Sequence, residues 1–309
     1  MPSIEVIDGQ YIIRVKGPWP IVIFWETLWL SIVNELYYRY TVGDLEKYFP
    51  EGERRLLEKI DPLNSLSEWT NFIEFGTRRR FCREWQRRVL EICMDAKVPM
   101  IGTSNVSLAM ELGLDPKGTM AHEEGMVYSG IYHDEDDAAG TFVSHEKMLD
   151  DWFDFYGEPL SIALTDTYGS QYFFRTFGEE RARKWRGPRQ DSADPFAFGE
   201  FTIDYYRGYG IDPASKLWVP SDGLNCQTIV ELDKRFRGRI HTSAGWGTTM
   251  TNDMGLPTLS IVAKAVEANG YGTVKLSDNI AKATGTPDDI ARAKLFVGYT
   301  GNNYQECLV

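Results

Sequence analysis

Residues 72–105 read FIEFGTRRRFCREWQRRVLEICMDAKVPMIGTSN, and this stretch decides the fold class. It begins with a short apolar run, continues with a segment in which Trp85, Val89 and Ile92 recur at helical spacing, and ends with a second apolar run before Gly102. A strand, a helix with one apolar face and another strand make a βαβ unit. Repeated units of this kind predict a parallel sheet covered by helices.

The same alternation continues toward the C-terminus. Further apolar runs, each followed by a turn and usually by a helix, lie at 160–164, before Arg189, at 216–219 and at 239–242. Asp194-Pro195 is typical of a helix start, with a capping side chain and then proline at the first helical position. A parallel α/β barrel is therefore the natural candidate for the fold.

The N-terminal residues predict a β-hairpin. Two β-rich runs, 4–7 and 11–15, flank Asp8-Gly9, a dipeptide that favours a tight turn. The residues that recur next at helical spacing are Trp25, Leu28, Ile32, Val33 and Leu36. They predict an amphipathic helix whose apolar face packs over that sheet.

The composition limits the classes of partner. With 309 residues and 43% hydrophobic content, the chain can bury a large core. The formal net charge of −12 argues against a protein that binds nucleic acid or an anionic membrane surface, because both need excess Lys and Arg. The acidic stretch 134–137 matches no metal-binding spacing and is expected to be a surface loop.

The cysteines and the apolar segments indicate a cytoplasmic protein. The four cysteines form no C-x-x-C pair and no pattern with histidine that suits zinc, so we expect reduced thiols. The most apolar region, 19–36, is interrupted by Glu26, Asn34 and Glu35, so it is interpreted neither as a signal peptide nor as a membrane span.

Small and polar residues gather in the loops that follow the predicted strands. In chain order these loops are 76–78, 102–105, 121–123, 165–167, 189–194, 221–223 and 244–248. In a parallel barrel such loops meet at one end and carry the reactive groups. Small residues let backbone N–H groups approach phosphate oxygens, and helix N-termini favour anions. A phosphorylated small-molecule substrate is therefore the predicted ligand class.

The loops also carry a specific resemblance. The strings EFGTRRRF, IGTSN, GTMAHE, ALTDTYGS, RQDSADP, PSDGLN, AGWGTTMTNDMG and VKLSDN occur in this order and resemble those of bacterial-type nicotinate phosphoribosyltransferases. The resemblance implies an irregular parallel α/β barrel, which we expect at 69–257. It also implies a smaller α+β domain formed by the two chain ends, residues 1–68 and 258–309.

The resemblance implies a nicotinate site and an activity. Nicotinate and PRPP would give nicotinate mononucleotide and pyrophosphate, a salvage route to NAD. The pyridine ring would lie near Phe75, with Arg78, Thr103 and Ser104 at the carboxylate. A planar cation suits a carboxylate, and an aromatic face suits a pyridine. Nicotinamide-using relatives carry an acidic residue at the position of Ser104, so serine favours the acid.

The resemblance also implies a site for the phosphoribosyl donor. The residues expected around PRPP are Arg78, Asp166, Arg189, Asp191, Asp222, Gly223, Gly245, Gly247 and Thr248. Carboxylates suit both ribose hydroxyls and Mg²⁺, and Asp166 and Asp191 are the expected magnesium ligands. The transfer needs positioning of the ring nitrogen and stabilisation of the departing pyrophosphate, and it needs no covalent nucleophile.

His122 in GTMAHE has a separate expected role. In the resembled family this histidine is phosphorylated by ATP, and its hydrolysis drives product formation. A neutral imidazole nitrogen is nucleophilic near pH 7. Arg189 and Asp191 are expected to act beside it. The other histidines, His133, His145 and His241, have no such context and are interpreted as structural or surface residues.

Two departures from the resembled family stand out. Ala193 replaces the usual glycine of its loop, where positive φ or close approach to ligand is expected. An N-terminal segment, with an Asp-x-Tyr-Lys-like motif whose tyrosine stacks on nicotinate across a homodimer interface, is not found in the 309 residues. The alternatives are therefore a nicotinamide or quinolinate phosphoribosyltransferase, or a shortened non-catalytic homologue that binds phosphoribosyl ligands.

Overall fold

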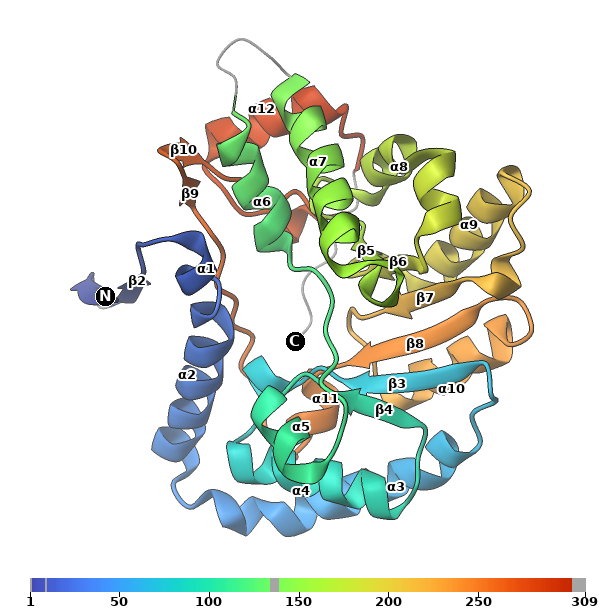
Figure 1. The fold of residues 1–309 in the computed structure, drawn as a ribbon. Coiled ribbons are helices and arrows are strands. Elements are labelled where there is room, and N and C mark those ends of the chain that lie inside the picture. Colours follow the sequence, from blue (N-terminus) through green and yellow to red (C-terminus); the bar gives the residue numbers. More distant parts are fainter. Residues whose placement is uncertain (1, 9, 134–138, 302–309) are drawn as a thin grey trace.

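The computed structural model describes residues 2–8, 10–133 and 139–301, so the acidic stretch 134–137 and Cys307 lie outside the described residues. Its centre is a six-stranded parallel sheet surrounded by helices (Figure 1). The strands are β3 (Thr70–Glu74), β4 (Met100–Thr103), β5 (Ile162–Leu164), β6 (Gly187–Gln190), β7 (Leu217–Pro220) and β8 (His241–Trp246).

The strand order is β4-β3-β8-β7-β6-β5, and every neighbouring pair is parallel. This is the cyclic order of a barrel opened between β4 and β5. Within the described residues no ladder joins these two strands. Instead Thr103 forms a parallel bridge with Pro116, and Thr119, a little further along the chain, accepts a hydrogen bond from Arg189 of β6. The α/β fold with a parallel sheet is confirmed, and its irregularity lies in this gap.

Helices follow the strands as the βαβ pattern predicts. The elements between β3 and β8 are η2 (Thr77–Arg79), α4 (Arg83–Asp95), α5 (Val106–Leu112), α6 (His122–Ile131), α7 (Ala139–Tyr156), η3 (Glu158–Leu160), α8 (Ser170–Lys184), α9 (Pro195–Gly208), η4 (Pro213–Ser215) and α10 (Cys226–Phe236), with α11 (Thr248–Thr251) after β8. Side chains cap several starts: Asp194 accepts from Ala197 N at 2.8 Å, as expected for Asp194-Pro195.

Aromatic side chains fill the space between the sheet and its helices. Phe72 and Trp246, on the adjacent strands β3 and β8, meet edge to face with ring centroids 5.6 Å apart. Trp218 of β7 packs against Phe236 of α10 in the same way at 5.1 Å. All four are fully buried, and burying a side chain of this kind stabilises the fold by about 2–3 kcal/mol. The core therefore holds the strand ends, and with them the loops, in fixed positions.

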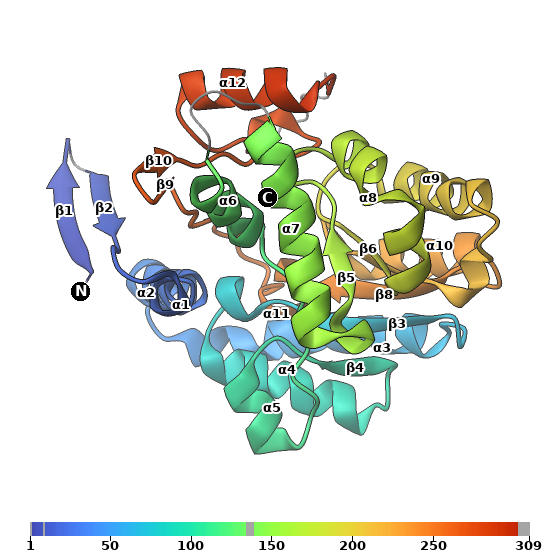
Figure 2. The same cartoon turned by 45° about the horizontal axis from the view of Figure 1, so that its top comes forward.

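The N-terminal region contains β1 (Ser3–Ile7), β2 (Gln10–Arg14), α1 (Trp19–Val22), α2 (Trp25–Val42), η1 (Leu45–Tyr48) and α3 (Phe49–Asn64). The predicted hairpin is present, but it is a separate two-stranded sheet that projects from the molecule (Figure 2). The expectation that the next helix covers this sheet was wrong. Helix α2 instead packs against the β3 loop, where Asn34 Nδ2 donates to Arg80 O at 2.6 Å and Tyr38 packs on Phe81.

The predicted apolar face of α2 is also corrected. Leu28, Ile32 and Leu36 are each about half exposed, while Leu30, Ser31, Asn34 and Tyr38 are buried. Tertiary contacts with Arg80 and Phe81 decide which face turns inward. The apolar spacing therefore identified a helix correctly and its buried side wrongly.

The C-terminal region returns to the sheet edge and to the N-terminal helices. Its elements are β9 (Glu267–Ala268), β10 (Tyr271–Gly272), η5 (Ile280–Lys282) and α12 (Pro287–Val297). Lys264 Nζ lies 3.1 Å from Glu26 Oε1 of α2, so the N-terminal and C-terminal regions touch, and the proposed domain boundaries stay a prediction. Among the described helices, none combines the length and the apolar character that crossing a membrane requires.

Candidate active site

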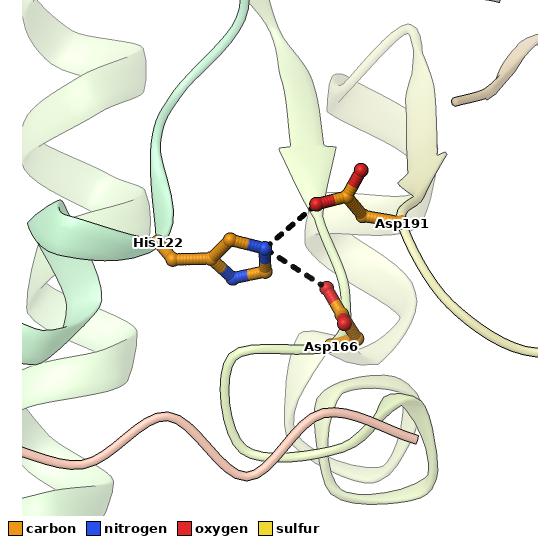
Figure 3. Close-up of side chains that lie close together, drawn as sticks. All are labelled: His122, Asp166 and Asp191. Carbon is orange, nitrogen blue, oxygen red and sulfur yellow. Dashed lines mark hydrogen bonds and ion pairs between the residues drawn. The ribbon is translucent and has the colours of Figure 1, made fainter. Parts of the chain in front are cut away.

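His122 is the first residue of α6, and its ring is buried. The ring points toward two carboxylates that follow β6 and β5, Asp191 and Asp166 (Figure 3). Its Nε2 lies 2.8 Å from Asp191 Oδ2 and 3.5 Å from Asp166 Oδ1, and its Nδ1 lies 3.2 Å from Thr167 Oγ1. Because an ionised carboxylate only accepts, a neutral His122 carries its hydrogen on Nε2.

The charges around His122 favour a neutral ring beside an ionised carboxylate. Burial lowers the pKa of His122, although Asp166 pulls it upward. Burial also acts to raise the pKa of Asp191, but the charge of Arg189 and the contact with His122 outweigh it and hold that pKa well below its usual range. The start of a helix disfavours a cation as well. The pair is therefore an uncharged imidazole next to a fixed negative charge.

Asp166 is fully buried behind this pair. Its Oδ2 accepts from Ser192 Oγ at 2.7 Å and Ser277 Oγ at 3.0 Å, and Lys275 Nζ lies 3.6 Å away. Burial acts to raise its pKa, but Lys275 and His122 lower it overall. Oδ1 of Asp166 has no hydrogen bond to any described residue. A buried carboxylate oxygen without a donor is a ready ligand atom for a cation.

Arg189, at the end of β6, links three loops. Its guanidinium donates from Nε to Ser221 Oγ at 2.8 Å, from Nη1 to Thr119 Oγ1 at 2.8 Å and from Nη2 to Asp191 Oδ1 at 3.0 Å. The same group lies over the ring of Phe75, 5.8 Å from its centre. Arg189 is thus a preorganised cation with an aromatic face below it.

Phe75 follows β3 and is half-buried, so simple core packing does not describe it. The glycines beside it leave its ring room. A Cβ at Gly245 would lie 2.7 Å from the Phe75 ring, and one at Gly247 would lie 3.5 Å from Phe75 O. Gly247 precedes the short helix that begins at Thr248, and Gly223 has φ of +59°. These residues lie at or just beyond the carboxyl ends of the parallel strands β3, β7 and β8, so they line the same sheet edge.

Arg78 takes a different partner. Its Nη1 donates to Glu26 Oε1 of α2 at 2.8 Å, and Lys264 Nζ lies 3.1 Å from the same oxygen. Burial acts to raise the pKa of Glu26, but the two cations lower it overall. Through these contacts, α2 and the C-terminal segment that carries Lys264 are connected to the loop after β3. A ligand carboxylate that binds Arg78 has to compete with Glu26.

The loops after β3 and β4 meet through hydroxyls. Ser104 Oγ lies 2.7 Å from Thr77 Oγ1, and Ser104 is partly exposed. Thr103 is fully buried, and its hydroxyl donates to Glu74. The Thr103 side chain is therefore occupied within the protein, whereas Ser104 is partly exposed to solvent.

Asp222, in the loop after β7, pairs with Lys282 Nζ at 2.6 Å. Burial raises the pKa of Asp222 despite the opposing charge of Lys282. Ala193, in the loop after β6, has φ of +68°, in the left-handed region where glycine is normally favoured. The sequence-based expectation of positive φ at this loop is confirmed.

Comparison with known proteins identifies the family. The profile of the nicotinate phosphoribosyltransferase (NAPRTase) family matches residues 70–301. The chain belongs to the nicotinate phosphoribosyltransferase family. A nicotinate phosphoribosyltransferase from Porphyromonas gingivalis superimposes with a TM-score of 0.87 at 33% identity, covering 96% of this chain and 76% of that one. One from Vibrio cholerae gives 0.87 at 32%, covering 96% and 72%.

Apart from the three glycines and Thr248, the predicted residues of this nicotinate phosphoribosyltransferase family site fall into three groups. His122, Asp166, Asp191 and Arg189 form one connected cluster, and Phe75 lies against Arg189. Ser104 and Thr103 lie at the neighbouring β4 loop. Arg78 and Asp222 are each paired with a residue outside the prediction, Glu26 and Lys282. Their roles toward substrates stay predictions.

The sequence reasoning missed several buried polar residues of the site. Lys275 and Ser277 approach Asp166 from the C-terminal region, and Ser277 does so with φ of +63°. They lie inside VKLSDN, a string that marked the family without showing where it folds. Glu74 and Gln86 are also buried, and only Glu74, a polar residue within an apolar run, carried a signal that could have drawn attention to it.

Proposed function

We propose that the chain catalyses transfer of the phosphoribosyl group of PRPP to nicotinate, giving nicotinate mononucleotide and pyrophosphate, and that ATP drives the reaction through His122. We further propose that it works in the cytoplasm, which its free Cys82, Cys93 and Cys226 support. Membership of the nicotinate phosphoribosyltransferase family supports the transfer. The observation that carries the assignment is Arg189, placed between Phe75 and Asp191.

Arg189 connects the two halves of the proposed site. On one side its guanidinium lies over Phe75, where a pyridine ring can stack. On the other it is bonded to Asp191, which reaches His122. A fixed cation between an aromatic face and a carboxylate suits a reaction in which pyrophosphate leaves a ribose carbon that becomes positively charged. Asp191 would face the sugar and Arg189 the phosphates.

For PRPP we propose a cradle of loops at the ends of β5 to β8. Asp166 and Asp222 offer carboxylates to ribose hydroxyls, and Gly223, Gly245, Gly247 and Thr248 bring backbone N–H groups to the 5′-phosphate. We propose that Asp166 and Asp191 hold Mg²⁺, which would neutralise charge on pyrophosphate. The unbonded Oδ1 of Asp166 supports this. His122, Asp166 and Asp191 also each offer one possible ligand atom, and these atoms lie within 4.8 Å of one another.

For nicotinate we propose stacking on Phe75 and capture of the carboxylate by Arg78 and by the Thr103-Ser104 loop. Ser104 is the accessible hydroxyl there, since Thr103 is bonded to Glu74. Arg78 would exchange Glu26 for the substrate carboxylate. Two donors facing one substituent suit the acid, because a carboxylate accepts at both oxygens.

For ATP we propose that the His122 imidazole attacks the γ-phosphorus, releases ADP and forms phosphohistidine, which water then hydrolyses to free histidine and phosphate. The lowered pKa of His122 keeps the ring neutral and nucleophilic near pH 7. Its contact with Asp191 would couple phosphorylation to the transfer site.

We also propose a homodimer. An exposed apolar residue recurs at every fourth position from the N-cap of α2 along the helix, at Phe24, Leu28, Ile32, Leu36 and Tyr40. A continuous apolar stripe of this kind is typical of an interface, and a second copy of the chain is the partner we propose. Analytical ultracentrifugation tests it: Leu28→Glu with Ile32→Glu should give monomers, while Tyr37→Phe, on the same helix, should not.

The test of function is product formation from labelled nicotinate and PRPP, with and without ATP. We expect nicotinate mononucleotide in both cases and more of it with ATP. ATP should label wild type with acid-labile phosphate, and His122→Ala should retain slow transfer without ATP stimulation. His241→Ala, an exposed histidine, is the control. A label that persists in His122→Ala contradicts the ATP mechanism, and absence of any product favours a non-catalytic homologue.

Substrate choice is tested at Ser104. We expect Ser104→Asp to move preference from nicotinate toward nicotinamide, because a carboxylate accepts from an amide and repels an acid. Ser104→Ala serves as the matched control. An unchanged ratio of activities would discredit the assignment of this loop, and a wild-type preference for nicotinamide or quinolinate would identify a different transferase.

A further inference from the structure

Glu74, at the end of β3, is a fully buried acid outside the residues assigned above. Its side chain only accepts hydrogen bonds. Oε1 accepts from Gly76 N, and Oε2 accepts from Thr103 Oγ1 and, at 2.8 Å, from Gln86 Nε2. Burial raises the pKa of Glu74, while these donors work against that rise. Three donors on one side chain suit the carboxylate form.

Gln86, on α4, is also fully buried, and its amide can point only one way. Its Oε1 accepts from Arg80 Nη1 at 3.1 Å and from Asn105 Nδ2 at 2.9 Å. The Asn105 amide is itself oriented, because its Oδ1 caps α5 by accepting from Leu108 N at 3.1 Å. The Gln86 NH₂ group therefore faces Glu74 and Thr77 as a donor.

This orientation decides how the Thr77 hydroxyl is used. Thr77 Oγ1 accepts from Gln86 Nε2 at 2.9 Å and lies 2.7 Å from Ser104 Oγ. Thr77 is buried, so Ser104 is the described acceptor within reach of its hydrogen. If Thr77 donates to Ser104, the Ser104 hydrogen turns away from Thr77 and toward the open side of the loop.

We propose that Glu74 and Gln86 are positioning residues that set the direction of a hydrogen-bond relay through Thr77 to Ser104, so that Ser104 presents a donor to the substrate and selects an acid over an amide. This rests on the proposed function, in which Ser104 faces the pyridine substituent. With Arg78 also a donor, both oxygens of a carboxylate are satisfied, whereas the NH₂ of an amide would face a second donor. An unpaired buried donor lowers affinity by roughly ten- to hundredfold.

The decisive variant reverses the relay while conserving charge and shape. In the double variant Glu74→Gln with Gln86→Glu, the new acid accepts from Arg80, Asn105 and the Thr77 hydroxyl. Thr77 then accepts from Ser104, which presents a lone pair outward. We expect the ratio of kcat/KM for nicotinate over nicotinamide to fall about tenfold or more. The same ratio in Kd, measured by calorimetry, should follow it.

Measuring the double variant in a Ser104→Ala background distinguishes an effect that acts through the relay from a general disturbance of the site. In that background the double variant should leave the ratio unchanged, because the last hydroxyl is gone. Arg88→Gln, an exposed position on the same helix, is the control, and thermal melting reports folding. Should the double variant not fold, Thr77→Val removes only the middle link and should lower the ratio several-fold.

The outcomes separate the two proposals. A wild-type chain that prefers nicotinate and keeps its ratio within twofold in both the double variant and Thr77→Val overturns the relay alone. A fall in the ratio that persists equally in the Ser104→Ala background also overturns it, because the effect then bypasses Ser104. A chain that binds neither base overturns the proposed function and the relay together.

Discussion

His122 Nε2 lies 2.8 Å from Asp191 Oδ2, so the first residue of α6 is bonded directly to the residue that follows β6. The other oxygen of Asp191 accepts from Arg189 at 3.0 Å. Asp191 therefore orients His122 with one oxygen, while the other oxygen also lies 3.0 Å from Ser221 Oγ. Any change of protonation or of covalent state at His122 acts on Asp191, and through it on Arg189.

We predict that Asp191→Asn lowers kcat/KM by roughly 10- to 100-fold both with and without ATP. The amide can accept at only one atom, so it loses a charge-assisted hydrogen bond of about 1.5–3 kcal/mol to His122 or Arg189. His122→Ala, in contrast, should affect only the ATP-dependent part. Steady-state rates with and without ATP compare the two. If both variants lose the same part of the rate with and without ATP, Asp191 acts only through His122.

We predict that Arg78→Lys raises the KM for nicotinate about tenfold with little change in kcat. A lysine keeps the charge but loses the planar two-donor geometry that suits a carboxylate. Arg88→Lys, on the exposed face of α4, is the matched control and should leave KM unchanged. A KM effect on PRPP instead of nicotinate would move Arg78 to the phosphate side.

We predict that Ala193→Gly raises the free energy of unfolding by about 1 kcal/mol or less. Ala193 has φ of +68°, which glycine adopts without strain, although part of the gain is lost to the greater entropy of the unfolded glycine. Ala197→Gly, in the first turn of α9, should lower stability by about 0.5–1 kcal/mol. Urea unfolding measures both, and a loss at both positions contradicts strain at Ala193.

We predict that His145 makes the protein less stable in mild acid. Its ring is buried among Tyr168, Tyr172 and Phe173, and neither ring nitrogen has a hydrogen bond to a described residue. Burial lowers its pKa to about 4. The unfolded chain, with a pKa near 6.5, binds the proton first, so stability is complete above pH 6.5 and falls as pH drops toward 4.

At its limit, this shift in pKa lowers the free energy of unfolding by about 3 kcal/mol. Chemical unfolding at several pH values measures it. His145→Phe should remove this part of the pH dependence, whereas His241→Phe, at an exposed ring that stacks on Trp69, should retain it. If the free energy of unfolding depends on pH in the same way in wild type and in His145→Phe, the pKa of His145 does not change on folding.

Much of the fold was predictable because its signals are local. Each strand of the parallel sheet was expected within a few residues of its position, since short apolar runs before glycine-rich turns depend on neighbouring residues alone. The hairpin around Asp8-Gly9 and the cap at Asp194 were equally local. The buried face of α2 was not, because Arg80 and Phe81, far along the chain, decide it.

By itself, the sequence determined the family, the alternation of strands and helices, and the loops that carry the reactive side chains. Only the tertiary structure decided which of those side chains are joined. It placed Asp191 between His122 and Arg189, paired Arg78 with Glu26, and brought Lys275 to Asp166. The physical reason is distance along the chain: buried charges find partners through packing of remote segments, and no local pattern specifies which remote segment arrives.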